Sequence, residues 1–379
     1  MSHDRRSFIK STALAGTAGL LTAALGAERA SAAMGKGPDK VSMYSNGTYD
    51  VVPLVKPSIT LGVVQSRVRS VRVDKASQDR NTNLAHMLEL IDASFHFSSG
   101  ADILFFHEFP ITGFNVWTRK ENLQVAIEIP GPETQQVAAK AKQHGCYIVF
   151  GSYARDDDWP DHVLSITTII SPDGEIIDKH WKARNIKGVF PGVELFTTTI
   201  YDVLDEYVEM YGADAVLPVT RTPAGNLVTS SVQREPELFR AFAMKGGEIF
   251  LRTATGGFSS WDMQATAGYN GVYTAVSNNA YSPNNPKFFA DAGSGGSAVY
   301  GPRGEVVAEV DTKFETMLPA RIPIAQFRER HRQPFVHMDL YREVFATYRN
   351  AYAPNLFSDY LPTDLYDAKN FLKDKSIWK

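Results

Sequence analysis

The chain has 379 residues, of which 44% are hydrophobic and 21% charged, and its formal net charge is −3. This near-neutral balance, with no long basic run, argues against nucleic acid as the main partner. The one cysteine, Cys146, has no second cysteine with which to form an internal disulfide. The nine histidines show no HxxxH or HxH spacing with a third ligand nearby, which argues against a dedicated transition-metal site.

Residues 1–32 have the pattern of a bacterial export signal. The segment DRRSFIK places two arginines before the apolar run STALAGTAGLLTAALGA, and small residues follow at Ala30-Ser31-Ala32. This pattern predicts twin-arginine export, cleavage near Ala32 and a periplasmic or secreted protein. A membrane anchor needs about 20 continuous apolar residues, and this run is shorter. Residues 33–56 are irregular and predict a linker or arm.

From Ile59 onward, short apolar strands alternate with helical patterns, which is typical of the α/β class. The turns PDGE and GPRGE join neighbouring strands directly, so part of the sheet is predicted to be antiparallel. Residues 195–222 resemble an insertion that carries a short helix. The predicted strands include ITLGVVQ, DILFFHE, CYIVFGSY, LSITTIIS, IIDKHWK and YTAVSNN, and the predicted helices include NLAHMLELIDASFHF, ETQQVAAKAKQHG and MQATAGYNGV.

The stretch NLVTSSVQREPELFRAFAMKGGEIF, residues 226–250, predicts a strand, a tight turn, a helix and a second strand. Many hydrolases hold a nucleophile at such a turn, at the rim of a sheet. Here the turn offers Ser230, Ser231, Val232, Gln233 and Arg234, and it contains no cysteine.

Two further positions could carry chemistry. Glu108 ends an apolar strand, and a carboxylate against such a wall tends to have a raised pKa and can act as a general base. The alternative is a structural carboxylate that pairs with a backbone turn. Lys182 follows the strand that contains Trp181, and a lysine beside a carboxylate could stabilise an oxyanion. Alone, such a lysine is more often a solvated charge.

Taken together, these segments resemble the nitrilase, or carbon–nitrogen hydrolase, superfamily over about residues 57–325. The segment GADILFFHEFPITGF is similar to the glutamate segment of the family, PDGEIIDKHWK to its lysine segment, and EPELFRAFAMKGGEIFLR to the helix after its nucleophile. The resemblance implies an αββα half-sandwich that forms a four-layer αββα–αββα dimer. It also implies hydrolysis of a small amide or nitrile by a Glu–Lys–Cys triad, with no metal or organic cofactor.

In this resemblance, Glu108 matches the general base and Lys182 the oxyanion-stabilising lysine, but no cysteine matches the nucleophile. Counting back from Pro236 places Ser230 at that position, whereas counting forward from Gly225 places Val232 there; the spacing to the helix favours Ser230. Cys146 opens a core strand and is expected to be structural. The chain is therefore either an amidase-type hydrolase with an altered nucleophile, or a silent relative that binds an amide-like ligand or serves in assembly.

Two histidines lie near these positions in the sequence, and an acidic loop lies between Glu108 and Lys182. His107 adjoins Glu108, but neighbours on a strand point to opposite faces. His180 lies two residues before Lys182 and remains a weak candidate for a base. The acidic residues 156–158 have the pattern of a solvated loop.

Residues 326–379 form a tail similar in character to those of the aliphatic amidase and formamidase branch. Tyr341, Phe345, Tyr348 and Tyr352 recur at helical spacing and predict one aromatic stripe on a helix. Such a stripe must pack either on the chain's own flank or on a second subunit, and we favour an oligomerisation tail in a homodimer or higher homo-oligomer.

Overall fold

The computed structural model describes residues 40–96, 98–282 and 295–378. The predicted export signal, residues 1–32, lies outside these ranges. Within them, the helices are all too short or too polar to cross a membrane.

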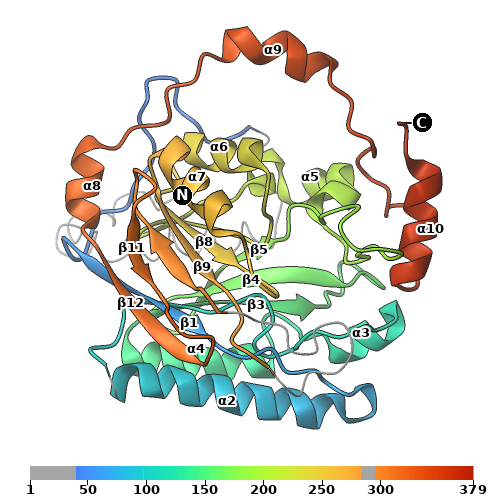
Figure 1. The fold of residues 1–379 in the computed structure, drawn as a ribbon, viewed down its shortest axis with the longest axis horizontal. Coiled ribbons are helices and arrows are strands. Elements are labelled where there is room, and N and C mark those ends of the chain that lie inside the picture. Colours follow the sequence, from blue (N-terminus) through green and yellow to red (C-terminus); the bar gives the residue numbers. More distant parts are fainter. Residues whose placement is uncertain (1–39, 97, 283–294, 379) are drawn as a thin grey trace, which may run out of the picture.

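Two mixed six-stranded sheets form the centre of the fold (Figure 1). Sheet 1 has the order β12-β1-β2-β3-β4-β5, in which β1, β2 and β3 are parallel and the other neighbours are antiparallel. The predicted PDGE hairpin joins β4 to β5. The strands of sheet 1 are β1 (Ile59–Gln65), β2 (Ile103–Phe105), β3 (Tyr147–Ala154), β4 (Leu164–Ile170), β5 (Ile176–Trp181) and β12 (Thr316–Ile322).

Sheet 2 has the order β11-β10-β9-β8-β7-β6, with β7, β8 and β9 parallel. Both of its edges are antiparallel: β6 pairs with β7 at one edge, and the predicted GPRGE hairpin joins β10 to β11 at the other. The strands of sheet 2 are β6 (Thr220–Thr222), β7 (Gly225–Ser230), β8 (Ile249–Thr253), β9 (Tyr273–Ser277), β10 (Ala298–Tyr300) and β11 (Val306–Glu309).

Helices cover the outer face of each sheet. In Figure 1, α2 and α4 lie against sheet 1, and α6 and α7 lie against sheet 2. The chain is thus an α/β protein with the αββα layers that the sequence predicted. The helices are α2 (Ala76–His96), α3 (Arg119–Val125), α4 (Pro132–His144), α5 (Leu204–Tyr211), α6 (Pro236–Met244), α7 (Ser260–Asn270), α8 (Ile324–Arg330), α9 (Met338–Thr347) and α10 (Leu365–Lys375), with 3-10 turns at η1 (Val73–Lys75), η2 (Ile200–Val203) and η3 (Ala213–Val216).

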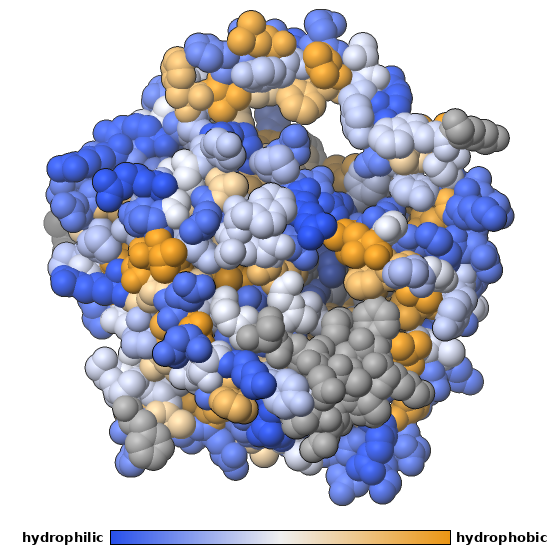
Figure 2. Space-filling view, in the orientation of Figure 1, coloured by the Kyte–Doolittle hydropathy of each residue, from blue (hydrophilic) through white to orange (hydrophobic). Residues whose placement is uncertain are grey.

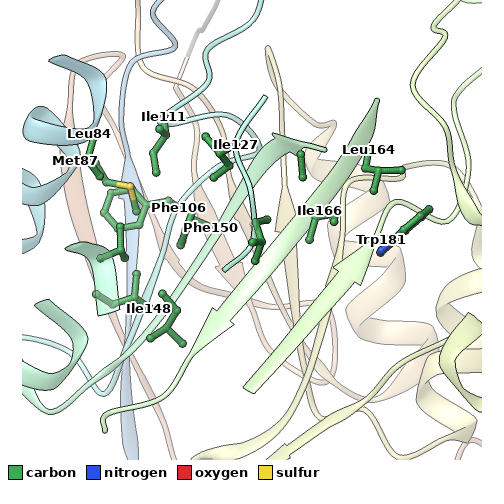
Figure 3. Close-up of a cluster of buried hydrophobic side chains, with 14 of the residues drawn as sticks. Leu84, Met87, Phe106, Ile111, Ile127, Ile148, Phe150, Leu164, Ile166 and Trp181 are labelled. Carbon is green, nitrogen blue, oxygen red and sulfur yellow. The ribbon is translucent and has the colours of Figure 1, made fainter. Parts of the chain in front are cut away.

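The alternation of side chains along each strand divides the core into layers. In β3, Ile148 and Phe150 pack in the cluster formed with α2 and α4 (Figure 3), whereas Val149 packs between the two sheets. On the far side, Phe239 and Phe242 of α6 pack against sheet 2. Strands buried on both faces explain the continuous apolar runs in the sequence.

Two strands and one strand end differ from the sequence expectation. One of these strands is the short β6, which falls within residues 195–222, the segment expected as an insertion. The sequence did not indicate β12, because TMLPARI contains a proline and does not alternate cleanly; it nevertheless pairs antiparallel with β1 at the edge of sheet 1, where a proline is tolerated. The strand expected over DILFFHE ends at Phe105. His107 and Glu108 therefore lie on the segment that leaves the sheet rather than in the strand.

The tail splits into two parts with different surroundings. Helix α10 packs on the body of the chain, where Leu365, Ala368 and Leu372 are buried. Helix α9 stands apart as an arch over the body and carries several apolar side chains on its surface (Figures 1 and 2).

The predicted aromatic stripe on a single tail helix is wrong. Only Tyr341 and Phe345 lie in α9, because the backbone becomes extended at Tyr348. Beyond that residue, contacts with the body replace helical continuation: the Tyr352 carbonyl accepts a hydrogen bond from Tyr201, and its ring lies under the Lys187 ammonium.

Candidate active site

The two charged residues singled out in the sequence meet where the two sheets approach each other. Glu108 follows β2, and its backbone N–H donates to the Ala254 carbonyl just beyond β8. Lys182 follows β5, and its Nζ lies 3.0 Å from Glu108 Oε1. Both side chains are almost fully buried, with exposed fractions of 10% for Lys182 and 5% for Glu108. The carboxylate and the ammonium are therefore in direct contact.

The backbone of Glu108 reaches this place because β3 has a glycine beside it. A Cβ at Gly151 would lie 2.4 Å from the Glu108 carbonyl oxygen. Cβ atoms in real proteins do not come this close to a backbone oxygen, so only glycine fits here. The Gly151 N–H also donates to the His107 carbonyl. The glycine in the apolar segment CYIVFGSY is thus required by the close passage of the Glu108 segment.

Two hydroxyl groups that the sequence reading missed complete the surroundings of Glu108. Ser165 Oγ, at the start of β4, donates to Oε1 at 3.1 Å, and Thr255 Oγ1, after β8, donates to Oε2 at 2.5 Å. The sequence places Glu108 against an apolar wall, but three donors hold the carboxylate. Ser165 could have been inferred, because it lies at the end of β4 that pairs with the Lys182 segment.

These groups line a cavity of about 90 Å³. This volume is far below the roughly 300–1,000 Å³ of sites for drug-sized ligands, so the cavity suits a molecule of only a few heavy atoms. Its polar end holds Glu108, Lys182, Ser165 and Thr255. Its apolar wall is formed by Phe109, Phe114, Tyr153, Phe190, Leu195 and Phe258.

A larger surface groove of about 860 Å³ runs beside α2, where Arg69, Asn81 and His86 contribute to its lining. The contact between Glu108 and Lys182 lies in the smaller cavity. We therefore place the candidate site in the smaller cavity, because its polar groups converge on one point.

The turn after β7 forms another wall of the cavity through Ser231, Val232 and Gln233. Ser230 is the last residue of β7 and is buried, and its Oγ accepts a hydrogen bond from the Val232 N–H at 3.2 Å. Ser230 is not among the residues that line the cavity, whereas its sequence alternative Val232 is. The structure thus brings Glu108 and Lys182 together and places Ser230 at the end of β7, directly before the turn that lines the cavity.

Arg184 ties this turn to the segment that carries Lys182. Its guanidinium pairs with Glu235 and donates through Nη2 to the Gln233 carbonyl at 3.1 Å. Arg184 also lines the cavity, and its side chain is about a quarter exposed. The cavity is therefore bounded by a bridge between the end of β5 and the turn.

The other candidates from the sequence lie elsewhere. His180 bonds through Nδ1 to Thr229 of β7 and through Nε2 to Thr220 of β6. His107 is fully buried, and burial lowers its pKa to about 3, so that it is neutral at physiological pH. Burial raises the pKa of the Cys146 thiol to about 12, so this thiol is unreactive.

The hydrogen-bonding capacity that remains in the cavity shows what it can bind. A carboxylate oxygen accepts about two bonds, so Glu108 Oε1 is filled by Lys182 and Ser165, and Oε2 keeps one free position. The Lys182 ammonium has three N–H groups and uses one on Glu108. The site thus offers one acceptor and at least one charged donor, which complement the NH₂ and C=O of a carboxamide.

Across the described ranges, histidine, cysteine, aspartate and glutamate side chains form no group of three or more that could hold a metal ion. The cavity itself contributes one such side chain, Glu108.

Comparison with known sequences and structures gives a consistent answer. The chain is 26% identical over 187 residues to formamidases from Bacillus thuringiensis (strain Al Hakam) and Bacillus cereus (strain AH820). The match covers 48% of this chain and spans only half the length of each formamidase.

Among solved structures, the fold is similar to that of an amidase from Nesterenkonia sp. AN1. A variant of that amidase in complex with butyramide superposes with a TM-score of 0.54 at 17% identity, covering 75% of this chain and 96% of the amidase. Another variant from the nitrilase superfamily gives 0.56 at 18% identity, covering 77% and 99%. The carbon–nitrogen hydrolase family model matches residues 61–332. Since this match spans most of the chain, the protein belongs to the carbon–nitrogen hydrolase family.

Proposed function

We propose that this protein is an amidase-type member of the family that takes a small amide into the cavity beside Glu108 and Lys182. The observation that carries the proposal is the buried contact between these two side chains, with one acceptor position of Glu108 and further N–H groups of Lys182 left for a ligand. A nitrile offers an acceptor but no donor, so the unfilled position of Glu108 favours an amide over a nitrile.

In the proposed reaction, the Ser230 hydroxyl turns from the Val232 N–H toward the cavity and attacks the carbonyl carbon, while Glu108 takes the hydroxyl proton. Lys182 stabilises the negative oxygen of the tetrahedral intermediate. The C–N bond then breaks, Glu108 returns the proton to the leaving nitrogen, and ammonia departs. Water, deprotonated by the same carboxylate, hydrolyses the resulting ester and releases the acid and the serine.

A second candidate function is supported by the residues at the turn. Serine stands at the preferred nucleophile position and valine at the alternative one, and neither is a thiol. A carboxylate deprotonates a hydroxyl much less readily than a thiol. A protein that binds an amide-like ligand without turning it over, descended from the amidase and formamidase branch, is therefore the alternative.

Ligand stabilisation tests the proposed function. We expect acetamide or butyramide to raise the melting temperature of the wild-type protein, because a ligand that binds only the folded state stabilises it by mass action. Lys182→Met and Glu108→Gln should abolish the rise, since they remove the donor and the charged acceptor. Differential scanning fluorimetry, with ammonia release followed in the same samples, measures both binding and turnover.

Lys179→Met is the matched control, because Lys179 lies on β5, the strand that Lys182 follows, and contacts Asp156 rather than the cavity. It should keep the ligand-dependent rise. If short amides stabilise the Lys182→Met protein as much as the wild type, the proposed site is wrong.

We further propose that the chain forms a homo-oligomer through α9, whose residues are all exposed. Its apolar side chains are strongly exposed, including Leu340 at 73% and Val344 at 66%. An isolated helix shorter than about 12–15 residues is marginal in water, so a 10-residue helix that stands off the body needs a partner. A second copy of this chain is the partner that the predicted oligomerisation tail implies.

Charged substitutions on α9 should therefore lower the oligomeric state. We expect Leu340→Asp combined with Val344→Asp to shift the protein to a smaller species, because two carboxylates would be buried at the interface without partners. Sedimentation velocity measures the shift. Arg342→Ala, on the same helix, is the control and should leave the assembly unchanged. An unaltered sedimentation coefficient in the double variant would exclude α9 from the interface.

A further inference from the structure

A fully buried arginine lies behind the turn that lines the cavity. Arg252 of β8 has an exposed fraction of 0%, and its guanidinium lies 3.7 Å from the centre of the Phe239 ring. Its Nη2 donates to the Val232 carbonyl at 2.5 Å and to Asp262 Oδ2 at 3.1 Å, and Nη1 donates to Thr266 Oγ1 at 3.2 Å. Arg252 is thus bonded to the backbone of a residue whose other side faces the cavity.

Asp262 of α7 holds the same turn at a second point. Its Oδ2 accepts a hydrogen bond from the Arg234 N–H at 3.1 Å. Arg234 has φ of 60°, a left-handed conformation that non-glycine residues rarely adopt. The carboxylate therefore stabilises the turn at the residue where the backbone would otherwise relax.

The turn is consequently held from both sides. Arg184 contacts the Gln233 carbonyl from the cavity side, and the Arg252–Asp262 pair contacts Val232 and Arg234 from behind. Arg184 is partly exposed, whereas Arg252 is excluded from solvent, so the rear contact is the one that water competes with least.

A gain in folding stability alone does not explain why Arg252 and Asp262 are buried together. Removing two charges from water is costly, and replacing a buried ion pair by apolar side chains is often neutral or stabilising. The forked guanidinium, by contrast, can bond a carbonyl, a carboxylate and a hydroxyl in one fixed geometry, which a single ammonium cannot. The donors of the Arg252 guanidinium are therefore arranged to hold the backbone of the turn in one conformation.

We propose that Arg252 and Asp262 are positioning residues, which fix the turn of residues 231–235 at the wall of the cavity. This proposal rests on the proposed function only in taking that cavity as the ligand site; it does not require turnover. Loss of either side chain frees the turn and lets side chains at its tip leave the cavity wall.

A single introduced thiol reports where the turn lies. Ser231→Cys places a cysteine on the cavity wall, and the native Cys146 is buried with its pKa raised to about 12, so the parent protein provides a silent background. The thiol is alkylated either with iodoacetamide, a small amide, or with a maleimide carried on a polyethylene glycol chain. The ratio of the two rates is compared with that of a free cysteine peptide.

With the pair intact, we expect the bulky reagent to be disfavoured at least about tenfold, since a local opening that costs about 1.4 kcal/mol slows a reaction tenfold. Combining Ser231→Cys with Arg252→Met should return the ratio to that of the free peptide. Asp262→Ala should also return the ratio to that of the free peptide. If the Arg252→Met protein does not fold, the Asp262→Ala protein tests the proposal instead.

Arg328→Met is the matched control, because it breaks a buried pair with Glu248 at the opposite end of β8, away from the turn. It should keep the discrimination against the bulky reagent. The proposal is overturned if Arg252→Met and Asp262→Ala retain that discrimination, or if Arg328→Met loses it to the same extent. Because the readout is alkylation and not hydrolysis, a failure of the proposed function leaves this result interpretable.

Discussion

Ser230→Cys should create or strongly raise hydrolysis of short amides, whereas the wild-type protein should hydrolyse them very slowly or not at all. A thiol has a pKa of about 8.5, and each pKa unit corresponds to about 1.4 kcal/mol of proton-transfer work. A serine hydroxyl is several units less acidic, so it faces an additional barrier of roughly 5 kcal/mol when a carboxylate is the base. Since about 1.4 kcal/mol is tenfold in rate, even partial recovery is measurable as ammonia release from formamide, acetamide or butyramide.

Two further variants test whether Glu108 is the base and Ser230 the nucleophile. Glu108→Gln in the Ser230→Cys protein should abolish the new activity, because the base is lost while the thiol remains. Ser230→Ala in the otherwise unchanged chain should remove whatever slow activity the wild type has. A fast wild-type rate that Ser230→Ala leaves intact would show that another group is the nucleophile.

Val232→Cys distinguishes the two positions that the sequence left open. Val232 lines the cavity, but Ser230 has the spacing to Pro236 and ends β7 in register with Arg252. We expect the thiol at position 230 to give the larger gain, because residue 230 has the spacing to the following helix that the family resemblance gives to the nucleophile. Activity only in the Val232→Cys protein would assign the nucleophile position to residue 232.

The sequence indicated the α/β class because each of its signals was local, and the resemblance to the family added the αββα layers. The run CYIVFGSY is apolar on both faces, and ETQQVAAKAKQHG ends at Gly145, whose φ of 63° closes α4. Strand β12 escaped prediction because its pairing with β1 joins residues more than 250 positions apart. The end of α9 also differed, since contacts between Tyr352 and the body outweigh helical periodicity.

The candidate site could be predicted only in part, for a related reason. Glu108 and Lys182 stand out because each is a charged residue next to an apolar strand. Ser165 and Thr255 do not stand out, since hydroxyl side chains are common at strand ends and gain significance only when a carboxylate lies within 3.1 Å. In the sequence, Arg252 is one residue within a predicted core strand and gives no sign of a role. Only the structure, which buries its side chain with Asp262 behind the turn, indicates that it acts on the turn.

A second buried carboxylate, Glu248, joins three distant parts of the chain. It has an exposed fraction of 0% and accepts a forked pair of bonds from Arg328 of α8, with both contacts at 2.8 Å. The Tyr49 hydroxyl donates to it at 3.0 Å, and the Asn226 N–H of β7 at 2.7 Å. Burial and the neighbouring carboxylate raise the pKa of Tyr49, so its hydroxyl stays protonated and continues to donate.

Glu248→Ala should therefore lower the free energy of unfolding by about 3–5 kcal/mol, because it leaves the Arg328 guanidinium buried without its partner. Urea unfolding followed by tryptophan fluorescence measures the loss. Asp339→Ala is the control, since its pair with Arg342 is exposed and such pairs contribute at most about 1 kcal/mol. Adding Arg328→Met to Glu248→Ala should recover part of the stability by removing the orphaned charge. If the double variant is less stable than Glu248→Ala by the full effect of Arg328→Met alone, the two side chains act independently and the proposed coupling is absent.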